Sequence, residues 1–192
     1  MSNSVRSMTH YPYDALSVRF KDVTSSAENR ALLHRIKNND PGLTSLYIKE
    51  LNDDDDDDDD DDETFSPREG DDLSWLGYFI GRNETLKTLN IFYLPACQEQ
   101  FENFFFGMQR NKSIKEINFL GHGLLGKSLS AMNLPHVTSI WIDDSFDFEE
   151  AHHFAVGLHR CKSLVTYSGP MTAEIVVSLT ALPKLESVSL WR

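Results

Sequence analysis

Cysteine is scarce in this sequence: among 192 residues only Cys97 and Cys161 are present. Two cysteines in unrelated surroundings form neither a disulfide framework nor a metal-ligand motif. No run of apolar residues approaches the ~18 that a transmembrane helix needs, and the first residues lack the apolar core of a signal peptide. These absences predict an intracellular protein, most simply a cytoplasmic one, that holds no metal and has no membrane partner.

Positive charge is also scarce, with 18 lysines and arginines against 30 acidic residues and a net charge of −12. Ten of the acidic residues form one uninterrupted run from Asp53 to Asp62, and the rest of the chain is close to neutral. Because nucleic-acid-binding domains usually carry a basic stripe, the sequence predicts no nucleic-acid partner. Hydrophobic residues make up 40% of the chain, which is enough to build a core.

Three stretches of the sequence resemble one another: GRNETLKTLNI at residues 81–91, QRNKSIKEINF at 109–119 and HRCKSLVTYSG at 159–169. The first two carry apolar residues at i, i+3 and i+5, and the third carries only the first two of these. Three further stretches, at residues 41–48, 133–142 and 181–190, follow the same pattern. We call the first residue of each set its anchor. The anchors, at positions 43, 86, 114, 137, 164 and 185, are separated by 43, 28, 23, 27 and 21 residues. Four of these intervals suit a repeat of ~20–29 residues, and the long first interval contains the aspartates. The sets are Leu43/Leu46/Ile48, Leu86/Leu89/Ile91, Ile114/Ile117/Phe119, Val137/Ile140/Ile142 and Leu185/Val188/Leu190, with Leu164/Tyr167 weaker because Gly169 takes the third place.

The segments that precede the anchors carry a second, helical pattern. Apolar residues recur at i, i+3, i+4 and i+7, which is one face of an amphipathic helix, and three segments keep the same distance to the next anchor. The sets are Leu73/Leu76/Gly77/Ile80, Phe101/Phe104/Phe105/Met108 and Ala151/Phe154/Ala155/Leu158, and Asn29/Leu32/Leu33/Ile36 follows the pattern shifted by one residue. The sequence therefore predicts helices that alternate with short strands.

Residues around the predicted helices suggest how each helix begins and ends. Ser25 and Glu28 have the spacing of a capping box. Arg82, Arg110 and Arg160 are expected in the last helical turns, where a cation suits the helix dipole. Asn83 and Asn111 are expected to end their helices in the left-handed conformation. Upstream, residues 15–20 alternate like a first, capping strand.

This pattern resembles the leucine-rich repeat family, and the ~28-residue helical units are similar to the ribonuclease-inhibitor-like subclass. The resemblance rests on strands such as LKTLNI and on the shared helix register. It implies an α/β solenoid, a curved horseshoe with parallel strands on the concave face and helices on the convex face. It also implies a protein that binds other proteins and has no catalytic residues or cofactors.

The resemblance also implies a division of the chain. Residues 1–14 are expected to be a disordered tail, and residues 15–192 the solenoid, interrupted by a disordered acidic insert at 52–70. The chain ends at VSLWR, directly after a predicted strand. Because a solenoid needs a cap over its last apolar face, we expect either a fragment of a longer array or another covering for that end. The isolated chain is predicted to self-associate through Val188 to Trp191.

Strand geometry identifies the side chains that face away from the helices. In each strand the residue between the second and third apolar positions, and the residue after the third, point outward. Aromatic side chains mixed with asparagine make such a face suitable for a protein partner. The alternative is that these are only the solvated sides of strands. The predicted partner-binding residues are Tyr47, Lys49, Asn90, Phe92, Asn118, Leu120, Trp141 and Asp143.

Sharper motifs are few. Glu149 and His153 lie four residues apart and share a helix face, but no further metal ligand accompanies them. The aspartate run is either a solvated insert, a contact for a basic protein or a loose calcium site. The sequence thus predicts a non-enzymatic interaction scaffold or adaptor. The alternatives are an acidic cation-binding protein that acts through the aspartates, and a regulatory or inhibitory subunit of an enzyme.

Overall fold

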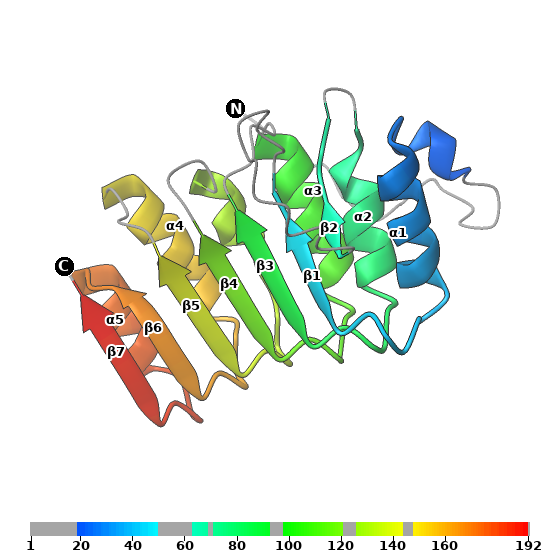
Figure 1. Cartoon of the computed structure of the whole chain (residues 1–192). Helices are drawn as coiled ribbons and strands as arrows, with labels where there is room; N and C mark the ends of the chain where they lie inside the picture. The colour runs from blue at the N-terminus through cyan, green and yellow to red at the C-terminus, as the bar shows by residue number, and fades with distance from the viewer. Residues whose placement is uncertain are drawn as a thin grey trace, which may run out of the picture.

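The computed structural model describes the chain in six stretches, residues 19–49, 63–68, 71–92, 98–120, 126–143 and 148–191. Within them the strands form one parallel sheet of seven, in the order β2-β1-β3-β4-β5-β6-β7. Figure 1 shows the helices side by side along one side of this sheet, so the fold is mixed α/β. The strands are β1 (Ser45–Ile48), β2 (Thr64–Phe65), β3 (Thr88–Phe92), β4 (Glu116–Leu120), β5 (Ser139–Asp143), β6 (Thr166–Pro170) and β7 (Ser187–Trp191).

Helices precede most of the strands, as the repeat pattern predicts. One unit, which ends in β5, has a six-residue 3-10 helix instead of an α-helix. Six residues of 3-10 helix span ~12 Å, the same length as an eight-residue α-helix, so a shorter unit can cover the same width of sheet. The helices are η1 (Phe20–Asp22), α1 (Ala27–Lys37), α2 (Leu73–Ile80), α3 (Gln98–Met108), η2 (Gly126–Ala131), α4 (Phe148–Leu158) and α5 (Ala173–Thr180).

The core lies between the helices and one face of the sheet. All four predicted helix faces are buried, and so are the strand sets of β1 and β3 to β5. Aromatic rings connect successive units: the ring centroids of Phe119 and Phe154 lie 6.5 Å apart, and those of Phe154 and Tyr167 lie 6.3 Å apart. Each buried phenylalanine contributes roughly 1.5–3 kcal/mol by leaving water. The residues that the repeat pattern assigns to the inner faces of these helices and strands are therefore the ones that form the core.

The weak third position of one repeat has a steric explanation. Tyr167 is fully buried, and its hydroxyl donates a hydrogen bond to the carbonyl of Pro170 at 3.1 Å. A Cβ at Gly169 would lie 2.5 Å from that hydroxyl oxygen. The tyrosine thus fills the space that a third apolar side chain occupies in the other strands, and glycine is the residue that fits beside it.

The stretch after the aspartates differs from the disordered insert expected over residues 52–70. Thr64 and Phe65 form β2, which pairs in parallel with β1 at the edge of the sheet. Phe65 is fully buried, and Asn29 of α1 holds the next residue, because its amide donates to the Ser66 carbonyl at 2.7 Å and accepts from the Ser66 N–H at 3.0 Å. Burial and these bonds order a segment whose composition looks like a loop.

Several predictions about the ends of helices are also corrected. The N-cap of α1 is Ser26, whose hydroxyl accepts from the Asn29 N–H at 3.1 Å, and not Ser25. Among the described non-glycine residues only Asn39 has a positive φ, of 54°, so Asn83 and Asn111 are not left-handed.

Other predicted features either lie elsewhere in the structure than expected or fall outside the described residues. The arginines at 82, 110 and 160 follow their helices and do not lie in the last turns. Phe20 begins η1, a 3-10 helix, where a strand was expected. The predicted tail at 1–14, the rest of that strand and the run from Asp53 to Asp62 lie outside the described residues.

Candidate binding face of the sheet

The pairing of the strands aligns one outward column of side chains across the sheet. Tyr47 pairs with Asn90, Asn90 with Asn118, and Asn118 with Trp141, and the column continues through Ser168 and Ser189. Parallel partners in register point to the same face, so the residues that the sequence predicted for this column do lie together. A second column runs beside it through Phe92, Leu120 and Asp143, and Lys49 follows β1.

Two asparagines form the centre of this face. The Asn118 amide nitrogen donates to the Asn90 amide oxygen at 2.8 Å and to a Glu116 carboxylate oxygen at 3.0 Å. The Asn90 nitrogen donates in turn to the Ser45 hydroxyl at 3.3 Å. Because a carboxylate only accepts hydrogen bonds, Glu116 fixes which side of the Asn118 amide carries its nitrogen. The two amides are therefore oriented, and both are buried among their neighbours.

Two oxygens on the same face have no hydrogen-bond partner. Among the described residues the buried side-chain oxygens without a partner are Asn118 Oδ1 and Thr64 Oγ1. Thr64 pairs with Tyr47, so both atoms belong to the same column. An unsatisfied buried acceptor costs about 1–3 kcal/mol. Neighbouring atoms enclose both oxygens, so a donor could reach them only after the side chains around them move.

Aromatic side chains surround the amides. Trp141 is 37% exposed, and the rings of Tyr47 and Phe92, both half-buried, have centroids 6.3 Å apart. Such side chains offer large apolar area with little conformational entropy to lose on binding. Exposed carboxylates at Glu116 and Asp143 border them. The face thus combines apolar area, oriented amides and negative charge.

Some residues of this face escaped the sequence analysis. Thr64 lies in a strand of only two residues, too short to show an alternating pattern. Glu116 lies two residues before Asn118 on the same face, and only the alternation of β4 could have identified it.

Other chemistry that the sequence suggested is sparse. His153 Nε2 lies 3.8 Å from a Glu149 carboxylate oxygen, so the predicted pair does meet. In the described part of the chain no group of three or more potential metal-ligating side chains comes together. No helix in that part is both long enough and apolar enough to cross a bilayer.

Comparison with known proteins adds no relative. No protein-family model matches the chain, and a search of curated proteins finds no match either.

Proposed function

We propose that this chain is a leucine-rich-repeat solenoid that acts as a scaffold or adaptor and binds a protein partner on its outward strand face. The consecutive strand order β3 to β7 and the helices on one side of the sheet support the repeat architecture. The regular anchor spacing supports it as well. On this proposal the chain carries out no catalysis and needs no cofactor.

One observation carries the proposal: aromatic and amide side chains from four neighbouring strands come into register on a single face. Interfaces are enriched in tyrosine, tryptophan and phenylalanine, which together provide most of the binding energy in a few places. The hydrogen-bonded pair Asn90 and Asn118 would hold the polar centre of the face in one arrangement for a partner to match. A cytoplasmic location agrees with this function.

The test replaces the three aromatic residues together, as Tyr47→Ala, Phe92→Ala and Trp141→Ala. Because a central aromatic side chain of an interface contributes ~2 kcal/mol to binding, we expect the affinity for the partner to fall at least ~100-fold. Affinity purification with mass spectrometry first identifies proteins that the unaltered chain retains, and calorimetric titration then measures their binding. Circular dichroism should be unchanged.

The matched control is Phe106→Ala. Phe106 is also 37% exposed, but it belongs to α3 on the helical side. The proposal requires this variant to bind normally, and undiminished binding by the triple variant would refute it.

A deletion separates the proposal from its acidic alternative. Removal of the run from Asp53 to Asp62 should leave partner affinity within a few-fold if the strand face is the site. Loss of binding on deletion would instead assign the function to the aspartates, through a cation or a basic protein. If the partner is an enzyme whose turnover falls on binding, the scaffold is an inhibitory subunit.

A further inference from the structure

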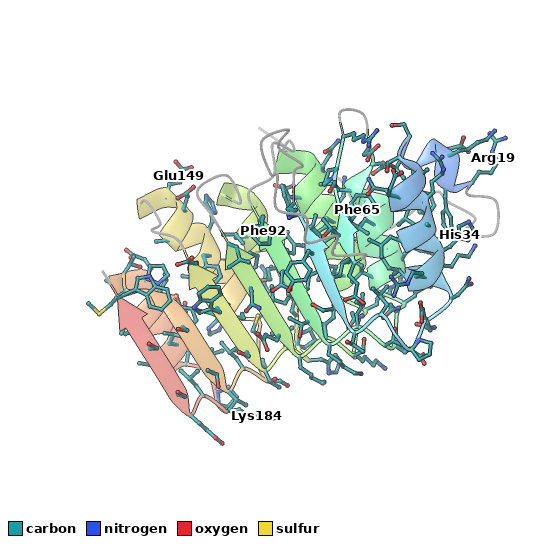
Figure 2. All side chains as sticks on the ribbon, in the orientation of Figure 1. Arg19, His34, Phe65, Phe92, Glu149 and Lys184 are labelled. Carbon is teal, nitrogen blue, oxygen red and sulfur yellow. The ribbon has the colours of Figure 1, made fainter. Side chains whose placement is uncertain are left out.

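A hollow of about 730 Å³ lies away from the strand face, at the turns that lead from α2 into β3 and from α3 into β4. Four of the residues that line it are cations, Arg82, Lys87, Arg110 and Lys112, and a single acidic residue, Glu84, accompanies them. Figure 2 shows Lys184, from a later turn of the same kind, at the edge of the molecule opposite Glu149. A chain with a net charge of −12 therefore has a locally positive site.

The repeat brings these cations together. Arg82 and Arg110 each lie four residues before an anchor, and the strands that follow them, β3 and β4, are hydrogen-bonded neighbours. The next strand, β5, is preceded by residues 134–138, LPHVT, which contain no lysine or arginine. The hollow itself is therefore lined by residues of two repeats, although single cations such as Lys162 and Lys184 also lie at later turns.

Two of the four cations have uncharged partners. The Arg82 guanidinium lies 4.1 Å from the centroid of the Tyr78 ring. The Lys87 ammonium lies 3.4 Å from the backbone carbonyl oxygen of Glu84. Within the described residues, none of the four cations has a carboxylate within salt-bridge distance.

Local structure accounts for only part of this cluster. The dipoles of α2 and α3 favour a cation just after each helix, where Arg82 and Arg110 lie. The same dipoles give no reason for Lys87 and Lys112, because this effect fades within about one turn. Four cations around one hollow repel one another, and a multiply charged anion would relieve that repulsion.

We propose that this cationic hollow binds a small anion that carries two or more phosphate groups. Phosphate oxygens project in several directions and can accept from cations on both sides of a hollow, whereas the oxygens of a carboxylate lie in one plane. The volume lies in the range of ~300–1,000 Å³ that small-molecule sites usually have. A long polyanion fits less well, because the net charge of the chain opposes it.

The test uses inorganic tripolyphosphate as the probe, titrated calorimetrically into the full chain. We expect one anion per chain and a loss of about tenfold in affinity for Lys112→Gln, since one charged hydrogen bond is removed. Lys162→Gln is the matched control. Both lysines are exposed and lie two residues before an anchor, but Lys162 is outside the hollow. Arg82→Gln should weaken binding at least as much as Lys112→Gln.

Equal losses for Lys112→Gln and Lys162→Gln would overturn the proposal, because they would show unspecific attraction. Tighter binding of a polyglutamate peptide or a nucleic-acid oligonucleotide would overturn it too. If the chain binds phosphoinositide-containing vesicles and tripolyphosphate competes with them, the phosphates belong to a lipid headgroup. If the chain does not bind these vesicles, the phosphates belong to a free small molecule. The triple variant of the strand face should bind tripolyphosphate normally, so this proposal and the proposed function fail independently.

Discussion

At the residue scale, two asparagines connect successive turns. Asn111 is buried three residues before its anchor, where its side-chain oxygen accepts from the N–H groups of Ser113 and Ile114 at 2.9 and 2.7 Å. Its nitrogen donates to the carbonyls of Ile80 and Asn83 at 2.6 and 2.9 Å. One side chain thus satisfies backbone groups of its own turn and of the preceding one. Asn83 does the same one repeat earlier, with its nitrogen donating to the Ile36 carbonyl.

Asn111→Ala should lower the free energy of unfolding by ~2–4 kcal/mol, because it leaves the N–H groups of Ser113 and Ile114 without their partner in a buried turn and removes one of the two donors to the Ile80 and Asn83 carbonyls. Urea denaturation followed by circular dichroism measures the loss. The control is Asn38→Ala at an exposed position after α1, where a change below ~0.5 kcal/mol is expected. Equal stability of the two variants would contradict the role assigned to Asn111.

A second residue-scale effect concerns alkaline pH. Burial raises the pKa of the Cys161 thiol from 9.0 to about 12, and it raises the pKa of the Tyr167 hydroxyl above its usual 10.0. Above pH ~9 the unfolded chain therefore releases a proton that the folded chain keeps. Raising the pH in this range consequently stabilises the unfolded state relative to the folded state. Stability is fully present below pH ~9 and falls as the pH rises toward ~12.

The Cys161 contribution to this fall has a slope of up to ~1.4 kcal/mol per pH unit. In Cys161→Ala the first part of the fall should disappear, and the decline should begin nearer pH ~10, where an unfolded tyrosine ionises. Denaturation series at pH values on both sides of these limits check the prediction. The same onset with and without Cys161 would disprove it.

At the element scale, glycines set the distance between neighbouring helices. Gly77 of α2 faces α3, and a Cβ there would lie 2.8 Å from the Phe104 Cα. A Cβ at Gly107 would lie 2.6 Å from the backbone nitrogen of Tyr78. Distances this short between a Cβ and backbone atoms are not tolerated. The two helix backbones therefore pack directly against each other, which matches the close stacking of consecutive repeats.

Gly107→Ala should destabilise the protein by ~1–3 kcal/mol, because the added methyl group pushes α2 and α3 apart. The sign is informative, since alanine is intrinsically better than glycine inside a helix by about 1 kcal/mol. Thermal unfolding compares this variant with Ala31→Gly, at an exposed position of α1 where propensity alone should act. A stabilised Gly107→Ala would show that the helices can separate freely.

The elements differ in how far the sequence reveals them. Phe104 and Phe105 could be identified as core residues because a helix face repeats within a few positions of itself. The roles of Asn83 and Asn111 could not, because their bonds depend on residues 47 and 28 positions away, respectively, being adjacent in space. β2 escaped as well, since two residues carry no periodicity and its pairing is decided by burial of Phe65. Local periodic patterns could therefore be predicted from the sequence, whereas contacts between repeats could not.

At the scale of the whole molecule, the two edges of the sheet differ. Among the described strands, β2 forms one edge with two residues, and β7 forms the other with five. Val188 and Leu190 of β7 pair with Tyr167 and Gly169 of β6, yet they are 44% and 39% exposed. A long edge strand with exposed apolar side chains is a typical site of association between chains.

We therefore expect the protein to associate with increasing concentration, and the double variant Val188→Lys and Leu190→Lys to remain monomeric. Sedimentation velocity over a range of concentrations measures this. Ser189→Lys adds a charge to the outward face of the same strand and should leave association nearly unchanged. A strictly monomeric unaltered protein would rule out the β7 edge as a contact.

The short β2 edge has a consequence for symmetry. Head-to-tail stacking would pair β7 of one copy with β2 of the next, and a two-residue strand offers little to pair with. Two β7 strands can instead meet antiparallel about a twofold axis, an arrangement in which each copy uses the same surface. Such a contact is closed, and it leaves no further β7 edge to extend. Two chains that meet in this way would form a dimer and no larger assembly.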